Sequence, residues 1–130
     1  MTSSSPLFPE FRHRVSQELI DRYARVSGDL NPLHIDPEFA ATTHFGRTIA
    51  HGMMALAFVS NAMEAWVGSR WIESSFIDVT FLAPVFPGDE ITITGACAES
   101  DEAGGEAISI RCRTGSGDVL VGRASIGPQA

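Results

Sequence analysis

The sequence contains no lysine, and all nine of its basic residues are arginine. Without lysine the chain cannot form a Schiff base, hold pyridoxal phosphate covalently or carry a phosphate-loop lysine. The 16 acidic residues outnumber the basic ones and give a formal net charge of −7. Binding to nucleic acid through its phosphates requires the opposite sign, so we expect no nucleic-acid partner.

Long apolar runs and cysteines are also scarce. The longest uninterrupted apolar run, Met53–Val59, has seven residues, whereas a membrane-spanning helix needs about 20, so we expect no membrane partner. Residues 1–6 have neither a basic start nor an apolar stretch, and we expect no secretory signal peptide. The two cysteines, Cys97 and Cys112, favour a reduced cytoplasmic location and cannot make a zinc site alone.

What the sequence does contain is typical of one globular domain. Its 130 residues are 44% hydrophobic and 19% charged, a composition that supports a single core but not two ordinary domains. The serine-rich start predicts a mobile N-terminal segment over residues 1–8. We expect the folded domain to occupy residues 9–130.

The first half of the chain carries clear helix signals. Residues 8–15 favour a short strand, and Ser16 is a typical N-cap for the apolar helix that follows, which Gly28 ends. The segment 29–47 is predicted to be irregular, except that Asp36, followed by proline, begins a short helix that ends near residue 42.

A central helix and a run of strands define the predicted fold. The helix predicted over Gly52–Val67 is apolar all round for nearly two turns, so we expect it to be buried on every side. The β-branched segments after it predict successive strands, which favours an α+β domain with a mainly antiparallel sheet curled around the buried helix. The predicted strands are 71–85, 90–98, 106–113 and 119–126.

One register can be predicted from the turn residues. A tight turn at Gly104-Gly105 would place Cys97 opposite Cys112. Period-two alternation would then put both cysteines on the core face together with Ile93 and the isoleucines of the second strand. We therefore expect two structural thiols that are neighbours in the core.

Two titratable side chains lie close together in the irregular segment. Asp29 and His34 are five residues apart, and Pro32 turns the chain between them. A carboxylate and an imidazole that meet in one pocket can share a water and exchange protons with a substrate. An Asx-turn, in which Asp29 and Asn31 satisfy local amides, is an alternative for the same residues.

The start of the central helix provides a second candidate feature, at Ala50-His51-Gly52. Free amides at a helix N-terminus carry partial positive charge, and glycine lets a ligand oxygen approach closely. This arrangement favours an oxyanion site. The alternatives are that Gly52 only permits close packing and that His51 is a structural histidine.

These residues resemble the signature of the MaoC-like, or R-specific enoyl-CoA hydratase, family. The resemblance rests on Ser27–Asp36, on Phe45-Gly46, on Ile49–Met53 and on the strand and turn at Phe81–Asp89. It implies the hot-dog fold, in which a curled antiparallel sheet encloses a long helix and two protomers pair, so a homodimer is expected.

The resemblance also implies an activity and residue roles. Asp29 and His34 match the acid–base pair of the hydratases, and Gly52 matches the amide that binds the thioester oxygen. Asn31 and Ser60 match supporting residues, and we place His51 with them. The implied reaction is reversible hydration of a trans-2-enoyl-CoA to an (R)-3-hydroxyacyl-CoA, with acyl-CoA as substrate, no cofactor and no metal.

Other functions remain as alternatives. An acyl-CoA thioesterase, like the acyl-carrier-protein dehydratases, would need a carboxylate early in the central helix. The single carboxylate of that helix, Glu64, lies three turns from its start, which argues against both. The chain could instead be the acyl-CoA-binding subunit of a heteromeric hydratase. His34 and Asp36 would suit an iron site only with a third, distant ligand.

Overall fold

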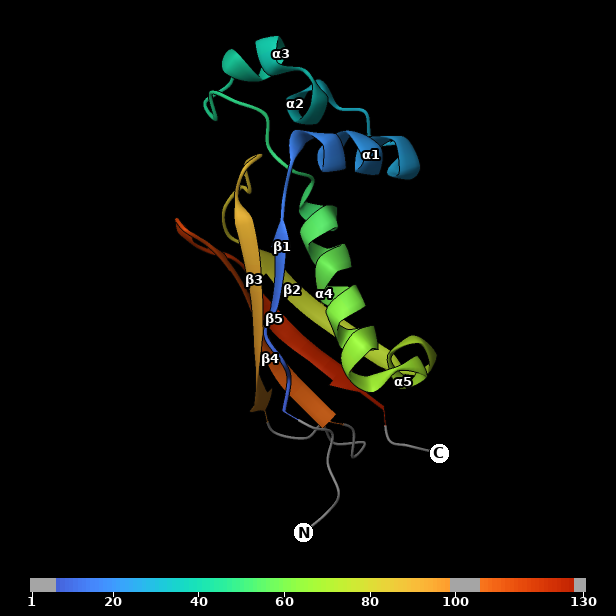
Figure 1. Cartoon of the computed structure of the whole chain (residues 1–130). Helices are drawn as coiled ribbons and strands as arrows, with labels where there is room; N and C mark the ends of the chain where they lie inside the picture. Colours follow the sequence, from blue (N-terminus) through green and yellow to red (C-terminus); the bar gives the residue numbers. More distant parts are fainter. Residues whose placement is uncertain (1–6, 99–105, 128–130) are drawn as a thin grey trace.

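A computed structural model describes residues 7–98 and 106–127 (Figure 1). Most of the segment predicted to be mobile, residues 1–8, lies outside the described residues. Among the described residues, no helix has both the length and the apolar character needed to cross a membrane. The elements are β1 (Phe11–Arg14), α1 (Gln17–Ser27), α2 (Pro32–Ile35), α3 (Pro37–Ala41), α4 (Gly52–Val67), α5 (Ser69–Glu73), β2 (Ser75–Phe81), β3 (Glu90–Ala98), β4 (Glu106–Thr114) and β5 (Gly117–Ile126).

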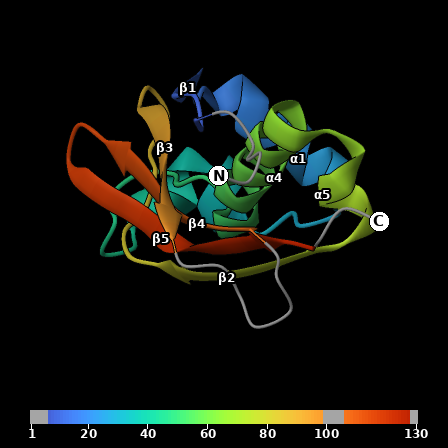
Figure 2. The ribbon, with the colours of Figure 1, turned by 90° about the horizontal axis from the view of Figure 1, so that it is seen from below.

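The strands form one antiparallel sheet in the order β1-β3-β4-β5-β2. Seen from below, the sheet curves around α4, while α1, α2 and α3 gather at the amino end of that helix (Figures 1 and 2). The prediction of an α+β domain with a curled antiparallel sheet and a central helix is confirmed.

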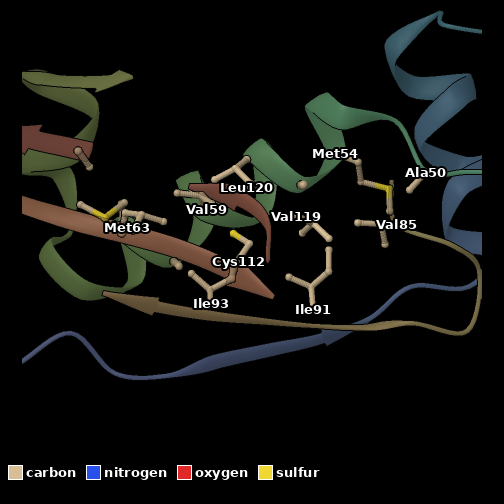
Figure 3. Packing of buried hydrophobic residues seen from close by; sticks show 14 of the residues in the cluster. Ala50, Met54, Val59, Met63, Val85, Ile91, Ile93, Cys112, Val119 and Leu120 are labelled. Carbon is tan, nitrogen blue, oxygen red and sulfur yellow. The ribbon is translucent and has the colours of Figure 1, made fainter. Parts of the chain in front are cut away.

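The core lies between α4 and the concave face of the sheet. Val59 and Met63 of α4 are fully buried and face Ile93, Cys112 and Leu120 of the strands (Figure 3). These apolar contacts fix the axis of α4 across the sheet, and with it the place where the helix begins.

The helix-capping residues predicted in the first half of the chain are confirmed. Ser16 Oγ accepts a hydrogen bond from Leu19 N at 3.0 Å, and Gly28 ends α1 with φ 80°, a left-handed conformation that glycine adopts without strain. Asp36 caps α3 as predicted. The short helix α2 was not predicted, because its four residues are too few for a periodic pattern.

The expectation that the central helix is buried on every side is wrong for the single chain. Its bounds are as predicted, but Met53 is 58% exposed. Asn61 and Glu64 are exposed as well. The face toward the sheet is buried, whereas Met53, within the apolar run, and the polar residues of the second half lie on a side of α4 that is exposed in the single chain.

The predicted strand over residues 71–85 begins too early and ends too late, since β2 spans Ser75–Phe81. Gly68, at φ 67°, ends α4, and Trp71 lies in the short helix α5, so β2 starts at Ser75. The buried Trp71 Nε1 donates to Ser60 Oγ at 2.9 Å. Trp71 is thus not a strand residue but the contact that holds α5 against α4.

The predicted register of the two cysteines is also wrong. Cys97 pairs with Ile108, and Cys112 pairs with Ile93; the predicted turn at Gly104-Gly105 lies outside the described residues. The pairing differs from the predicted one by four residues, which preserves the face but not the partner. Cys97 is exposed near the end of β3, whereas Cys112 is buried.

Candidate active site

Asp29 lies in the loop between α1 and α2, and these two helices gather at the amino end of α4 (Figure 1). Its backbone N–H donates to Ser27 Oγ at 3.2 Å, and its Oδ1 accepts from Asn31 N at 3.2 Å. Asn31 Oδ1 in turn accepts from Leu33 N at 3.0 Å and caps α2. The Asx-turn alternative is therefore present, but of the two carboxylate oxygens of Asp29 the turn uses only Oδ1. Oδ2 takes no part in it.

His34 faces that second carboxylate oxygen. Its Nδ1 lies 2.8 Å from the carbonyl oxygen of Ile49, and because a carbonyl only accepts, Nδ1 carries the hydrogen. In the neutral ring Nε2 is then an acceptor, and it lies 4.0 Å from Asp29 Oδ2. That separation exceeds a direct hydrogen bond but lets one water bond to both atoms.

His51 lies directly beside this pair. The residue is 3% exposed, and its Nε2 lies 3.0 Å from the main-chain carbonyl oxygen of Asp29. Its ring stacks on that of His34, with centroids 3.9 Å apart and planes 26° apart. Tyr23 contacts its ring at 4.9 Å. Residues from three segments therefore converge at the amino end of α4.

Gly52 begins α4 and borders a cavity of about 370 Å³. The cavity walls are mainly apolar and include Phe45, Phe81 and Val85. A Cβ at Gly52 would lie 3.4 Å from the ring of Phe81, so the ring rests on the first residue of the helix. A polar, partly positive helix end thus opens into an apolar space, which suits an oxygen atom attached to an apolar chain.

Ser60 occupies a different position. It lies eight residues beyond Gly52 on α4, about 12 Å along the helix axis at 1.5 Å per residue, and its hydroxyl accepts the hydrogen bond from Trp71 Nε1. The structure thus brings Asp29, Asn31, His34 and His51 together next to Gly52, and it places Ser60 near the middle of α4.

Several residues that hold the site were missed by sequence reasoning. Gln17 Nε2 donates to the His34 carbonyl at 2.8 Å, and Gln17 Oε1 accepts from Thr48 Oγ1 at 2.6 Å. The Ile49 carbonyl orients the His34 ring. A glutamine in the first turn of a helix and a main-chain carbonyl carry no motif, so only the fold could identify them.

The same cluster contains three metal-ligand types. One ligand atom from each of Asp29, His34 and His51 lies within 4.8 Å of the others. However, the lone pair of a ring nitrogen lies in the plane of its ring. Because the stacked rings of His34 and His51 lie in nearly parallel planes, their lone pairs do not converge on one ion. Asp36, the carboxylate considered for an iron site, accepts from Glu38 N and Phe39 N as a helix cap. The arrangement is better suited to proton transfer.

Comparisons with known proteins identify the family of the chain. The family model of the MaoC-like domain matches residues 5–117. The (R)-specific enoyl-CoA hydratase of Aeromonas caviae is 44% identical over 73 residues, 54% of this chain and 52% of that protein. The 3-hydroxybutyryl-CoA dehydratase of Methylorubrum extorquens is 29% identical over 119 residues, 88% of this chain and 74% of that protein.

A solved structure extends the likeness over the whole fold. The (R)-hydratase from A. caviae involved in PHA biosynthesis superposes with a TM-score of 0.80 at 29% identity, covering 98% of this chain and all of that one. In sequence, the chain matches about half the length of the first of the curated relatives. The model match, the fold and the residues at the start of α4 together establish that the chain belongs to the MaoC-like domain family.

Proposed function

We propose that this protein catalyses the reversible hydration of a trans-2-enoyl-CoA to an (R)-3-hydroxyacyl-CoA. The observation that carries the proposal is the 4.0 Å separation of Asp29 Oδ2 and His34 Nε2 beside the first turn of α4. The names of the similar hydratase and dehydratase support the substrate class and, for the hydratase, the stereochemistry.

The geometry accounts for each step of such a reaction. Asp29 and His34 hold one water and remove its proton as the oxygen bonds to C3 of the enoyl group. The C2–C3 π electrons move toward the thioester, and the amide at Gly52 stabilises the resulting negative oxygen. A proton returned to C2 from the same pair completes the addition, so the groups end in their starting protonation states.

The supporting residues act through the same contacts. Asn31 holds Asp29 Oδ1 and the start of α2, and His51 holds the Asp29 carbonyl. A supporting role for Ser60 stays a prediction, since its hydroxyl is bonded to Trp71.

The direct test is to mix the purified protein with crotonyl-CoA and with longer enoyl-CoAs, without added metal. We expect loss of the absorbance of the conjugated enoyl thioester, formation of the (R)-3-hydroxyacyl-CoA in chiral analysis, and no free thiol. Release of free CoA thiol would instead favour the thioesterase alternative, and an unchanged absorbance would contradict the proposal.

We also propose that two copies pair through the β2 edge of the sheet. β2 has seven residues with one charged side chain, Asp78, whereas the other edge strand, β1, has four residues that include Arg12 and Arg14. An exposed, mainly uncharged edge strand is a pairing site. Antiparallel pairing of two identical strands is self-complementary and gives a twofold dimer.

Exposed apolar side chains on and beside this edge support the same interface. Met53, Phe76, Phe81 and Leu82 are each about half or more exposed in the single chain. Burying them would also cover the open side of α4 and the cavity beside Gly52.

Light scattering on the purified chain tests the pairing. We expect twice the chain mass of 14.0 kDa, whereas a monomer that is active alone would contradict the proposed dimer. A chain that gains hydratase activity only with a second, different subunit would favour the heteromeric alternative.

A cytoplasmic location is proposed on chemical grounds. The two thiols, Cys97 and Cys112, are free, as is usual in a reducing compartment.

A further inference from the structure

The groups of the proposed reaction come from separate segments, and one buried side chain contacts each of those segments. Asp29 follows α1, His34 lies on α2, and Gly52 begins α4. His51 precedes Gly52 directly, hydrogen-bonds the Asp29 carbonyl and stacks on His34. His51 is therefore placed to set the distances among Asp29, His34 and the Gly52 amide.

The hydrogen bonds of His51 define its chemical form. A carbonyl oxygen cannot donate, so Nε2 must carry the hydrogen that meets the Asp29 oxygen at 3.0 Å. Nδ1 is buried and has no hydrogen-bond partner among the described residues. A protonated ring would bury a second N–H at Nδ1 without an acceptor, which is costly. The neutral form with hydrogen on Nε2 fits the contacts best.

His34 has the opposite arrangement. Its Nδ1 carries the hydrogen that meets the Ile49 carbonyl, and Nε2 is free toward Asp29. The two stacked rings therefore divide two tasks: His34 presents a basic nitrogen to the water, and His51 presents an N–H to the backbone. An imidazole is needed at position 51 because its ring stacks while its edge donates.

We infer that His51 is a positioning residue, which holds the Asp29 loop and the His34 ring at a fixed place relative to the Gly52 amide. This role rests on the proposed hydration. His51 does not exchange protons with the substrate, and it acts through the position of the acid–base pair.

Two variants separate the ring from the hydrogen bond. His51→Phe keeps an aromatic ring against His34 and removes the donor, whereas His51→Gln keeps a donor of similar reach and removes the ring. Displacement of a catalytic group by about 1 Å can reduce a rate by about a hundredfold. We expect His51→Phe to lower kcat by about tenfold to a hundredfold, with a smaller change in KM, and His51→Gln to recover part of the loss.

The outcome distinguishes this inference from the proposed function. A folded His51→Phe protein with the kcat of the wild type, while the wild type hydrates enoyl-CoA, overturns the inference alone. A wild-type protein without hydratase activity overturns the proposed function and, with it, this role.

A second measurement does not depend on the folding of any variant. Nitrogen NMR of isotopically labelled wild-type protein reports which imidazole nitrogen carries the hydrogen. We expect Nε2–H with a bare Nδ1 for His51 and the reverse for His34. Hydrogen on Nδ1 of His51 would overturn the inference, since the contact to the Asp29 carbonyl could not form.

Discussion

The two ends of α4 differ in composition, exposure and what they contact. At the amino end, Asp29 is 54% exposed in its side chain, and Gly52 borders a cavity. Toward the carboxyl end, Met63 is fully buried, and the hydrogen bond from Trp71 to Ser60, near the middle of α4, holds α5 against the helix. The polar groups of the proposed site thus lie at the amino end of α4, whereas the contacts described for the rest of the helix are mainly packing contacts.

This difference explains how a small domain can hold polar groups together without losing its fold. The exposed polar groups at the amino end contribute little to stability, and the apolar contacts of α4 with the sheet supply most of it. Substitutions at the two ends should therefore separate activity from stability.

The largest expected effect is on catalysis at the amino end. Asp29→Asn and His34→Ala should each lower the rate of enoyl-CoA hydration by about 10² to 10⁴, because each removes one partner of the shared water. The free energy of unfolding should change little. Steady-state kinetics together with denaturant unfolding measures both quantities, and unchanged rates in both variants would remove the site from this end.

A matched pair of leucines, one in the core and one in the Asp29 loop, tests how much core packing contributes to stability. Leu120 is fully buried against α4, whereas Leu30, beside Asp29, is 58% exposed. Leu120→Ala should lower the free energy of unfolding by about 2 to 5 kcal/mol, and Leu30→Ala by much less. Equal losses in urea unfolding would contradict the contrast between the buried core under α4 and the exposed loop that carries Asp29.

Alkaline pH should weaken the closed core. Burial raises the pKa of Cys112 from 9.0 to about 12, so between these values the unfolded thiol loses its proton while the folded one keeps it. Stability should therefore fall as pH rises above 9, by up to about 1.4 kcal/mol per pH unit from this group.

The matched control for that prediction is a Cys112→Ala protein, in which the part of the loss due to the thiol disappears. In the folded wild type near neutral pH, a thiol reagent should modify the exposed Cys97 and spare Cys112. Equal reactivity of both thiols would show that the core is open.

The smallest effect on stability is expected at the hydrogen bond between Trp71 and Ser60, which holds α5 against α4. Ser60→Ala removes the acceptor of the Trp71–Ser60 hydrogen bond and should lower stability by about 1 kcal/mol. Trp71→Phe removes the donor and part of a buried ring, so its loss should be larger. We expect kcat to be retained in both. A lower kcat in Ser60→Ala alone would assign Ser60 to the catalytic apparatus, as the resemblance suggested. The groups that affect catalysis would then not be confined to the amino end of α4.

The sequence allowed prediction of those parts whose signals are local. Ser16, Gly28 and Asp36 act as caps through their own side chains or conformations, so the ends of their helices could be read directly. The long apolar run likewise gave the bounds of α4. The proximity of Asp29 and His34 followed from a short spacing and a proline.

Features set by distant contacts could not be predicted. The position of Trp71 depends on Ser60, eleven residues away, and the pairing of Cys97 depends on the whole β3–β4 hairpin. The orientation of His34 depends on the carbonyl of Ile49, which has no side-chain signature. Such contacts exist only once the chain is folded.

The most direct test of the central claim compares the double variant Asp29→Asn/His34→Ala with its two single variants. If both groups hold one water, removing the second after the first should cost little, and the double variant should be about as slow as the slower single variant. Losses that multiply would mean that the two side chains act independently and would contradict a shared water between them.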